Sequence, residues 1–295
     1  MSIKLIVTDM DGTLLNENIE MTPRAAEAIF RAQEAGLDFA IATGRTVKSG
    51  YTIVQEQGIT SPFIELNGAR LFDREGKIQF TRAIEKEETK ELIDIIEDYG
   101  IHNEFITQEV TYSNQTLDDY IDAFKAVFQS INPSLSDEAA IDVIKSRLSN
   151  LNVQTVDDYS FLYQNPDVQV LKTLVNTNDD VSILDEIQQT IEKKLPGLIV
   201  TSASTNNIEI NNKQANKGQA VAEYATSQGY KPSEVITIGD NINDLTMLEW
   251  ADHSYAVSNA HPRAKKVATY QAPSHKEDAV AQIIERVLEG KSLRF

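Results

Sequence analysis

The 295-residue sequence predicts an α/β protein: a Rossmann-like parallel sheet forms the core, and a second α/β segment is inserted into it. Three observations predict this fold class. Short apolar runs such as Leu5 to Val7 end in polar residues, which is typical of strands buried on both faces of a parallel sheet. Amphipathic helical patterns separate these runs. The region 84–210, roughly 125 residues, then interrupts the pattern and is too long for a loop.

The segment Lys4 to Leu15 reads KLIVTDMDGTLL and contains the first expected strand. Asp9 and Asp11 follow that strand at its carboxyl end, where open α/β sheets place their ligands. Gly12 allows the backbone to turn sharply after the second acid. Two carboxylates this close repel each other unless a cation lies between them, and Mg²⁺ suits such oxygen ligands. The segment therefore predicts a magnesium site, at which one acid attacks and the other handles protons.

The next expected element is a helix that begins at Thr22 and Pro23. Threonine suits the N-cap position and proline the first helical position. Gly36 suits the position just after the helix. The run LDFAIATGR follows as a second buried strand, so the first two strands should be parallel and joined by a right-handed crossover.

Thr43 and Gly44 end this second strand, so we expect them at the same sheet edge as Asp9. A hydroxyl and a backbone amide at the start of the next helix would bind phosphate oxygens, with help from the helix dipole. A threonine that only caps the helix explains position 43 as well, and the two roles are compatible. Arg45 either contacts the substrate or braces the pocket.

The third expected strand lies within 62–69 and ends at Asn67-Gly68, and a hairpin is expected over 71–80. In the inserted region, helix and strand patterns alternate. Helices are expected over 87–99 and 182–195, and strands over 109–112, 168–175, 198–204 and 207–210. The aspartates of this region are interpreted as a solvated acidic surface rather than as ligands.

The main domain resumes after residue 211. Lys217 stands at the entry to a helix expected over 219–228, where a cation would offset negative charge in the site. Lys213 is the rival candidate, and either lysine alone is an ordinary surface residue. Val235 to Ile238 is an apolar strand, and three polar side chains follow it at the start of a helix, Asp240, Asn243 and Asp244.

The segment DMDGT at 9–13 resembles the first motif of the haloacid dehalogenase superfamily of phosphohydrolases. In this resemblance Asp9 is the nucleophile and Asp11 the general acid/base. Thr43 is similar to the second motif, Lys217 to the third, and GDNIND at 239–244 to the fourth. The Asn67-Gly68 turn resembles the Cof-like sugar phosphatases, which carry a type IIB cap. The resemblance implies a catalytic core at 1–83 and 211–295 and a substrate-selecting cap at 84–210.

The resemblance also implies a set of ligands. Mg²⁺ would be held by the Asp9 side chain, the Asp11 backbone carbonyl and Asp240. Asp244 would lie next to these ligands without binding the ion itself. The phosphate group would be bound by the backbone amides of Met10 and Gly44, and by three side chains, Thr43, Lys217 and Asn243. Asp9 would then carry the phosphoryl group as an aspartyl phosphate.

Composition limits the partners. The formal net charge of −18 repels nucleic acid and anionic membranes, so we expect neither as a partner. There are no cysteines, no signal-like amino terminus and no apolar run long enough to span a membrane, so we expect a cytoplasmic protein. A small phosphorylated metabolite remains the expected partner, and we expect a monomer or a weak homo-oligomer.

Three functions remain open from the sequence. The first is a phosphatase acting on sugar phosphates or similar small metabolites. The second is a phosphomutase, which would return the phosphoryl group to a substrate hydroxyl. The third is a regulator that binds a phosphometabolite without turnover. The intact set of acids argues against the third.

Overall fold

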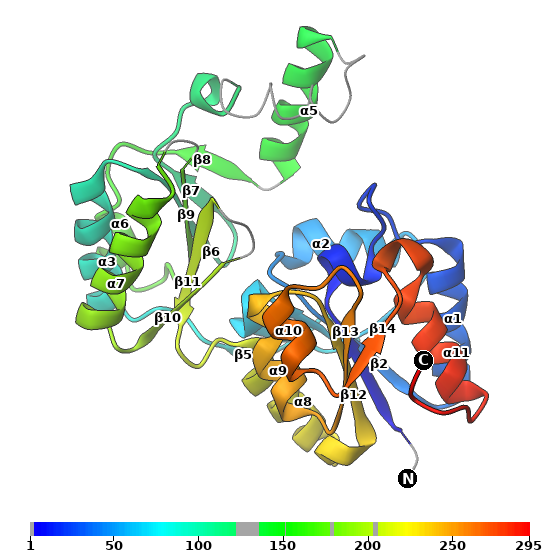
Figure 1. Cartoon of the computed structure of the whole chain (residues 1–295). Coiled ribbons are helices and arrows are strands. Elements are labelled where there is room, and N and C mark those ends of the chain that lie inside the picture. The colour runs from blue at the N-terminus through cyan, green and yellow to red at the C-terminus, as the bar shows by residue number, and fades with distance from the viewer. Residues whose placement is uncertain (1–2, 122–135, 151, 178–179, 203–205) are drawn as a thin grey trace. The chain divides into compact units, whose positions relative to one another are not determined.

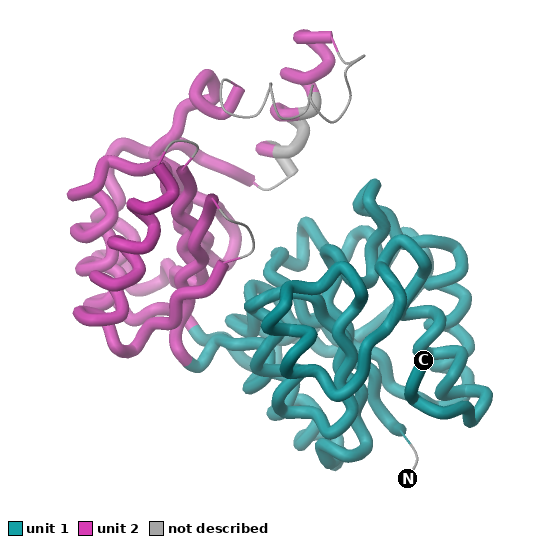
Figure 2. Tube along the Cα trace, in the orientation of Figure 1, with its two compact units in different colours: residues 1–82, 214–295 teal, residues 83–213 magenta. Residues whose placement is uncertain are grey.

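The computed structural model describes residues 3–121, 136–150, 152–177, 180–202 and 206–295. The chain forms two compact units (Figure 2). Unit 1 comprises residues 1–82 and 214–295, and unit 2 comprises residues 83–213. Within the described residues, no helix is both long enough and apolar enough to cross a lipid bilayer.

Unit 1 is built on an eight-stranded sheet with the order β14-β13-β12-β1-β2-β3-β4-β5 (Figure 1). The first six strands in this order are parallel, and β4 and β5 extend the sheet as antiparallel neighbours. The predicted parallel sheet and the hairpin are therefore confirmed. The strands are β1 (Leu5–Thr8), β2 (Asp38–Ala42), β3 (Phe63–Glu65), β4 (Arg70–Phe72), β5 (Ile78–Thr81), β12 (Val235–Gly239), β13 (His253–Val257) and β14 (Tyr270–Ala272).

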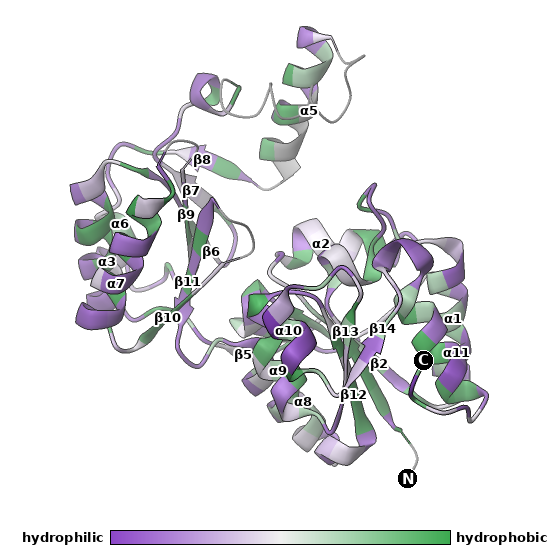
Figure 3. Ribbon diagram, viewed as in Figure 1, coloured by the Kyte–Doolittle hydropathy of each residue, from purple (hydrophilic) through white to green (hydrophobic). Residues whose placement is uncertain are grey.

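Helices cover both faces of this sheet, because its central strands are apolar on both sides (Figure 3). In β1, Ile6 packs into one apolar cluster with residues of α1 and α11, whereas Leu5 and Val7 pack into another with residues of α8. The helices are α1 (Pro23–Glu34), α2 (Val47–Gln55), α8 (Lys217–Ser227), α9 (Leu245–Trp250), α10 (Pro262–Val267) and α11 (Ala279–Leu288).

The helix ends show which capping predictions were right. Thr22 caps α1 by accepting a hydrogen bond from the Ala25 amide, as predicted. Gly36 follows that helix with φ of +81°, a conformation that glycine adopts without strain. The next helix differs from expectation: Thr46 caps α2, three residues after Thr43. A capping role for Thr43 was therefore wrong.

Unit 2 is a six-stranded sheet with the order β10-β11-β9-β6-β7-β8, antiparallel except for the β7–β8 pair. Its helices α3, α6 and α7 pack over an apolar cluster of their own. Strand β6 was not predicted, and residues 203–204 of one predicted strand lie outside the described residues. The elements are α3 (Lys86–Tyr99), β6 (His102–Thr107), β7 (Thr111–Ser113), α5 (Asp137–Asn150), β8 (Val153–Thr155), α6 (Phe161–Gln164), β9 (Val170–Asn176), α7 (Ser182–Lys194), β10 (Leu198–Thr201) and β11 (Asn207–Asn212).

Candidate active site

The site lies where three neighbouring parallel strands of unit 1 end. β1 pairs with β12 on one side and with β2 on the other, all running in the same direction. Asp9 follows β1, Asp240 follows β12 and Thr43 follows β2, so the register of the sheet brings these residues to one edge. Segments more than 200 residues apart in the chain are adjacent here for this reason.

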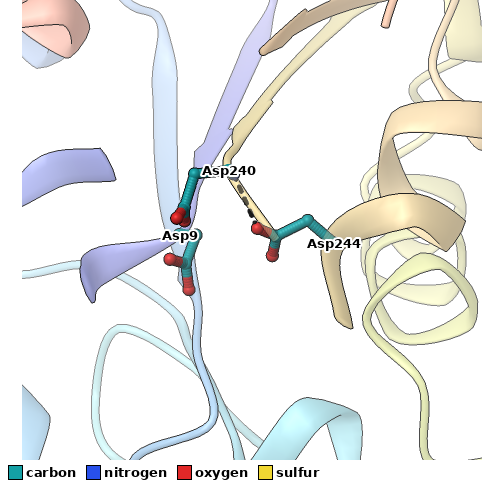
Figure 4. Close-up of side chains that lie close together, drawn as sticks. All are labelled: Asp9, Asp240 and Asp244. Carbon is teal, nitrogen blue, oxygen red and sulfur yellow. Dashed lines mark hydrogen bonds between the residues drawn. The ribbon is translucent and has the colours of Figure 1, made fainter. Parts of the chain in front are cut away.

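Three carboxylates gather at this edge (Figure 4). One oxygen from each of Asp9, Asp240 and Asp244 lies within 4.8 Å of the others. Asp9 is 5% exposed and Asp244 is fully buried. Water therefore screens their mutual repulsion poorly, and the cluster requires positive charge nearby.

Lys217 supplies part of that charge. Its ammonium nitrogen lies 2.6 Å from Asp9 Oδ1 and 2.6 Å from Asp244 Oδ1, and the side chain is fully buried. Lys217 is the first residue of α8, which Asn216 caps through the Gln219 amide. The other lysine considered from the sequence, Lys213, donates to the Pro196 carbonyl at 3.3 Å.

The pKa values of these side chains reflect the crowding of three carboxylates around one lysine. Burial raises the pKa of Asp9, Lys217 opposes the shift, and the charges of Asp244 and Asp240 add to it. Burial likewise raises the pKa of Asp240 to about 7, and the charge of Asp244 adds to the shift. Burial alone would lower the pKa of Lys217, but the two acids outweigh it and raise that pKa. Three acids thus share one lysine, and the donor set fits a divalent cation.

Asp244 is held in place by the backbone of the neighbouring strand end. Its Oδ2 accepts a hydrogen bond from the amide of Asp240 at 2.8 Å (Figure 4), and a second one from the amide of Asn241 at 2.9 Å. Its other oxygen pairs with Lys217. Both oxygens are therefore engaged, which favours a supporting position over direct coordination of an ion.

Two glycines allow the backbone to come this close. A Cβ atom at Gly239 would lie 2.6 Å from the Cβ of Asp244, and one at Gly12 would lie 2.7 Å from Asp240 Oδ2. Gly12 also has φ of +75°, in the region that favours glycine. A side chain at either position would displace an acid of the cluster.

Asp11 points its carboxylate to a different partner. Arg45 holds it through two hydrogen bonds, from Nε to Oδ2 at 2.7 Å and from Nη2 to Oδ1 at 2.6 Å. The Asp11 side chain is 51% exposed, in contrast to the buried Asp9. Burial lowers the pKa of Arg45, but Asp11 outweighs this and raises it. The structure thus pairs Arg45 with an acid of the first motif, a contact that the sequence left open.

The remaining predicted residues lie around the same strand ends. Thr43 is buried, and its Oγ1 accepts a hydrogen bond from the Arg45 amide at 3.2 Å. Asn243 donates from Nδ2 to Asn67 Oδ1 at 3.2 Å, which links the turns after β12 and β3. Met10 is fully buried in the apolar core, so only its main chain is available to a ligand.

Thr13 is a site residue that sequence reasoning did not select. Its hydroxyl donates to Asp240 Oδ1 at 3.1 Å and so orients one acid of the cluster. The sequence did contain a signal for this residue, because Thr13 is the last residue of the DMDGT segment. Asn259 also reaches this turn and donates from Nδ2 to the Gly12 carbonyl at 2.8 Å.

A parallel α/β sheet with a buried acidic cluster at its carboxyl edge is the architecture of α/β proteins that bind ligands at their strand ends. The chain belongs to the haloacid dehalogenase-like hydrolases, whose family model matches residues 6–284. The recognition of a Cof-like member of this superfamily, predicted from the sequence, is confirmed.

Relatives and solved structures resemble the chain over nearly its whole length. Phosphatase YwpJ of Bacillus subtilis is 26% identical over 290 residues, 97% of this chain and 100% of the relative. Pyridoxal phosphate phosphatase YbhA of Escherichia coli is 25% identical over 286 residues, 96% and 98% of the two chains.

Two solved structures share the fold. A haloacid dehalogenase-like hydrolase from Bacillus subtilis gives a TM-score of 0.84 at 25% identity, over 96% of this chain and 99% of that one. A subclass IIB sugar phosphatase of the same superfamily gives 0.75 at 21% identity, over 96% and 98%. The predicted fold class is confirmed.

Proposed function

We propose that the protein is a Mg²⁺-dependent phosphatase that hydrolyses phosphate monoesters of small metabolites through an aspartyl phosphate on Asp9. One observation carries the proposal. Asp9 is buried at a strand end, is paired with Lys217 at 2.6 Å and shares its pocket with two further acids. The coarser statement, that the chain is a phosphoric monoester hydrolase, agrees with the hydrolase family and with relatives named as phosphatases.

The proposed metal ligands are the Asp9 carboxylate, the Asp11 backbone carbonyl and Asp240. The raised pKa values of Asp9 and Asp240 support this assignment, because they indicate carboxylates whose negative charge lacks full compensation. When bound, Mg²⁺ would neutralise charge on the phosphate group and bring it close to these acids.

The protein's own groups then have distinct tasks. A carboxylate oxygen of Asp9 attacks phosphorus while the bond to the alcohol oxygen breaks, and Asp11 gives that oxygen a proton. Asp11 next takes a proton from the water that cleaves the aspartyl phosphate, which releases inorganic phosphate. Lys217 offsets the charge on Asp9 and the phosphate throughout.

The phosphate oxygens need donors that face them. We assign this role to the backbone amides of Met10 and Gly44 and to the side chains of Thr43 and Asn243. Thr43 supports the assignment by its burial at the end of β2, beside the strand that carries Asp9. Arg45 orients the Asp11 carboxylate through its two hydrogen bonds.

Unit 2 would act as the cap that selects the substrate. Its insertion between β5 and α8, and its own sheet and apolar core, support this role. We propose sugar phosphates as the substrate class, since a subclass IIB sugar phosphatase shares the fold. Such metabolites occur inside cells, so we place the enzyme in the cytoplasm, as a monomer or weak homo-oligomer.

A phosphate-release screen over phosphorylated metabolites, with and without Mg²⁺, tests the proposal. We expect Asp9→Asn to remain folded and to lose at least about 10⁴-fold in kcat/KM, because the nucleophile is gone. Asp252→Asn is the matched control, since it removes an exposed carboxylate of unit 1 and should leave turnover unchanged.

Other outcomes would point elsewhere. Substantial turnover by Asp9→Asn would remove Asp9 from the nucleophile role. Conversion of a hexose 1-phosphate to its isomer, without free phosphate, would indicate a phosphomutase. Binding of phosphometabolites without any phosphate release would indicate a regulator.

A further inference from the structure

The turn that follows β3 holds residues 43–47, a segment that contains several of the groups assigned to the proposed reaction. Two backbone hydrogen bonds make this connection. The Asn67 amide donates to the Thr43 carbonyl at 2.9 Å, and the Leu66 amide donates to the Arg45 carbonyl at 3.1 Å. The segment is therefore fixed to the strand beside it at two points.

Glu65, the last residue of β3, adds a side-chain contact to the same segment. Its Oε2 accepts a hydrogen bond from the Val47 amide at 2.5 Å, and its Oε1 accepts one from Arg70 Nε at 2.5 Å. Val47 is the first residue of α2, and Glu65 is fully buried. Burial raises the pKa of Glu65, and both donors oppose that shift. Each carboxylate oxygen faces an N–H donor, which fits the ionised side chain, because an added proton would displace one donor.

Stability alone does not explain this buried ion pair or the turn that follows it. Desolvation of two charges offsets most of their attraction, so apolar side chains of similar size at positions 65 and 70 would be about as stable. The turn is strained as well, because Leu66 is a bulky residue with φ of +49°. Such strain persists only where the surroundings enforce it, and it is concentrated at functional sites.

We propose that Glu65 is a positioning residue of the active site. By holding the first amide of α2, its carboxylate fixes the end of the segment in which Gly44 and Arg45 lie. The direction of the Gly44 amide, and the place from which Arg45 reaches Asp11, then follow from contacts with one strand end. The inference rests on the proposed function for the roles of Gly44, Arg45 and Asp11.

Hydrogen–deuterium exchange on the full-length protein tests the positioning without any assumption about turnover. The double variant Glu65→Leu/Arg70→Met replaces the ion pair by apolar side chains, so its free energy of unfolding should stay close to that of the wild type. The Val47 amide nevertheless loses its acceptor, and we expect amides of residues 44–49 to exchange at least about tenfold faster. Unchanged exchange over these residues would overturn the inference.

Phosphate affinity and turnover test the consequence for the site. With Mg²⁺ present, we expect the double variant to bind inorganic phosphate about tenfold more weakly by isothermal titration calorimetry, and to lose about 10–100-fold in kcat/KM. The Mg²⁺ concentration for half-maximal turnover should stay within about twofold, because the proposed metal ligands follow β1 and β12 and lie outside the segment. A general loosening of the protein would shift the Mg²⁺ dependence as well.

Lys4→Met/Glu234→Leu is the matched control. Glu234 also accepts a hydrogen bond from a backbone amide, that of Lys231 at 3.0 Å, and it pairs with Lys4 at 2.8 Å. It precedes β12, however, and so lies at the opposite end of that strand from Asp240. Phosphate affinity and turnover should therefore stay at the wild-type level in this control.

Val47→Pro removes the same contact from the side of the helix. Proline suits the first position of a helix, and Thr46 has ψ of 158°, which is compatible with a following proline. This variant should reproduce the losses of the double variant, whereas Val47→Ala keeps the amide and should not.

Two outcomes separate the inference from the proposed function. Wild-type phosphate affinity and kcat/KM in both Glu65→Leu/Arg70→Met and Val47→Pro would overturn the role of Glu65. A wild-type protein that neither binds inorganic phosphate nor releases it from any phosphoester would instead refute the proposed function, and the exchange rates would still decide whether Glu65 fixes the segment.

Discussion

The two units each bury a lysine, and the charges around the two lysines differ. In unit 2, Lys172 of β9 is 3% exposed and lies 2.5 Å from Glu209 Oε1 of β11. In unit 1, Lys217 is fully buried and lies 2.6 Å from each of two acids, with a third acid beside them. In the first arrangement, the described contact joins one ammonium group to one carboxylate. The second leaves an excess of negative charge that a bound cation would compensate.

Lys172→Met should cause a large loss of stability. It leaves Glu209 buried without its ammonium partner, and we expect a loss of about 3–5 kcal/mol in the free energy of unfolding. Urea denaturation measures this loss. The double variant Lys172→Met/Glu209→Leu should recover most of it, because no buried charge is then left unpaired. A loss below about 1 kcal/mol in the single variant would contradict a structural role for this pair.

Lys217→Met should lower turnover in addition to stability, because it leaves two buried acids without their ammonium partner. Without the Lys217 ammonium group, the negative charge on Asp9 and on the transferred phosphoryl group is less well neutralised. We therefore expect kcat/KM to fall by about 10²–10³-fold, or about 2.7–4 kcal/mol in activation free energy. Lys213→Met is the matched control and should remain within about twofold of the wild type. Equal losses in the two variants would mean that Lys217 has no special role.

Metal addition tests the excess negative charge directly. With Mg²⁺ at about 100 times its dissociation constant, we expect about 2.7 kcal/mol of added stability, measured as a rise in Tm over the protein in EDTA. Asp240→Asn should abolish most of the rise. Lys172→Met should retain it, because its ion pair lies in the other unit. A Mg²⁺ effect that Asp240→Asn leaves intact would place the ion elsewhere.

Arg45→Lys should give the smallest effect. Lysine keeps the positive charge but cannot make the two parallel hydrogen bonds to Asp11, so Asp11 is less well oriented. We expect kcat to fall by about tenfold, or about 1.4 kcal/mol, with little change in stability because the pair is partly exposed. Unchanged kcat would show that Arg45 does not position Asp11.

Much of unit 1 could be predicted from the sequence, because its central strands are continuous apolar runs that end in chemically distinctive residues. The parallel order of β12, β1 and β2 then brings Asp240, Asp9 and Thr43 to one edge. The pairing of Arg45 with Asp11 could not be predicted, since either a substrate or a pocket residue satisfies an arginine at that position. The N-cap residue of helix α2 is Thr46 rather than Thr43, and the sequence could not separate them because two threonines three residues apart have equal capping propensity.

Unit 2 was harder to predict. Strand β6 escaped recognition because Asn103, a polar residue, occupies one of its buried positions and breaks the alternation of apolar and polar residues. Its side chain donates from Nδ2 to the Ile101 carbonyl at 3.0 Å, a contact that the local alternation of apolar and polar residues does not reveal.

The two ends of the inserted unit lie close together. Asn212, at its end, donates from Nδ2 to the carbonyl of Ala83, at its beginning, at 2.8 Å. A segment whose two ends meet can be exchanged for another without altering the order of the strands that host it. With unit 2 in the substrate-selecting role proposed above, transplanting a foreign module between residues 82 and 214 would be a route to redirecting the hydrolase toward new compounds.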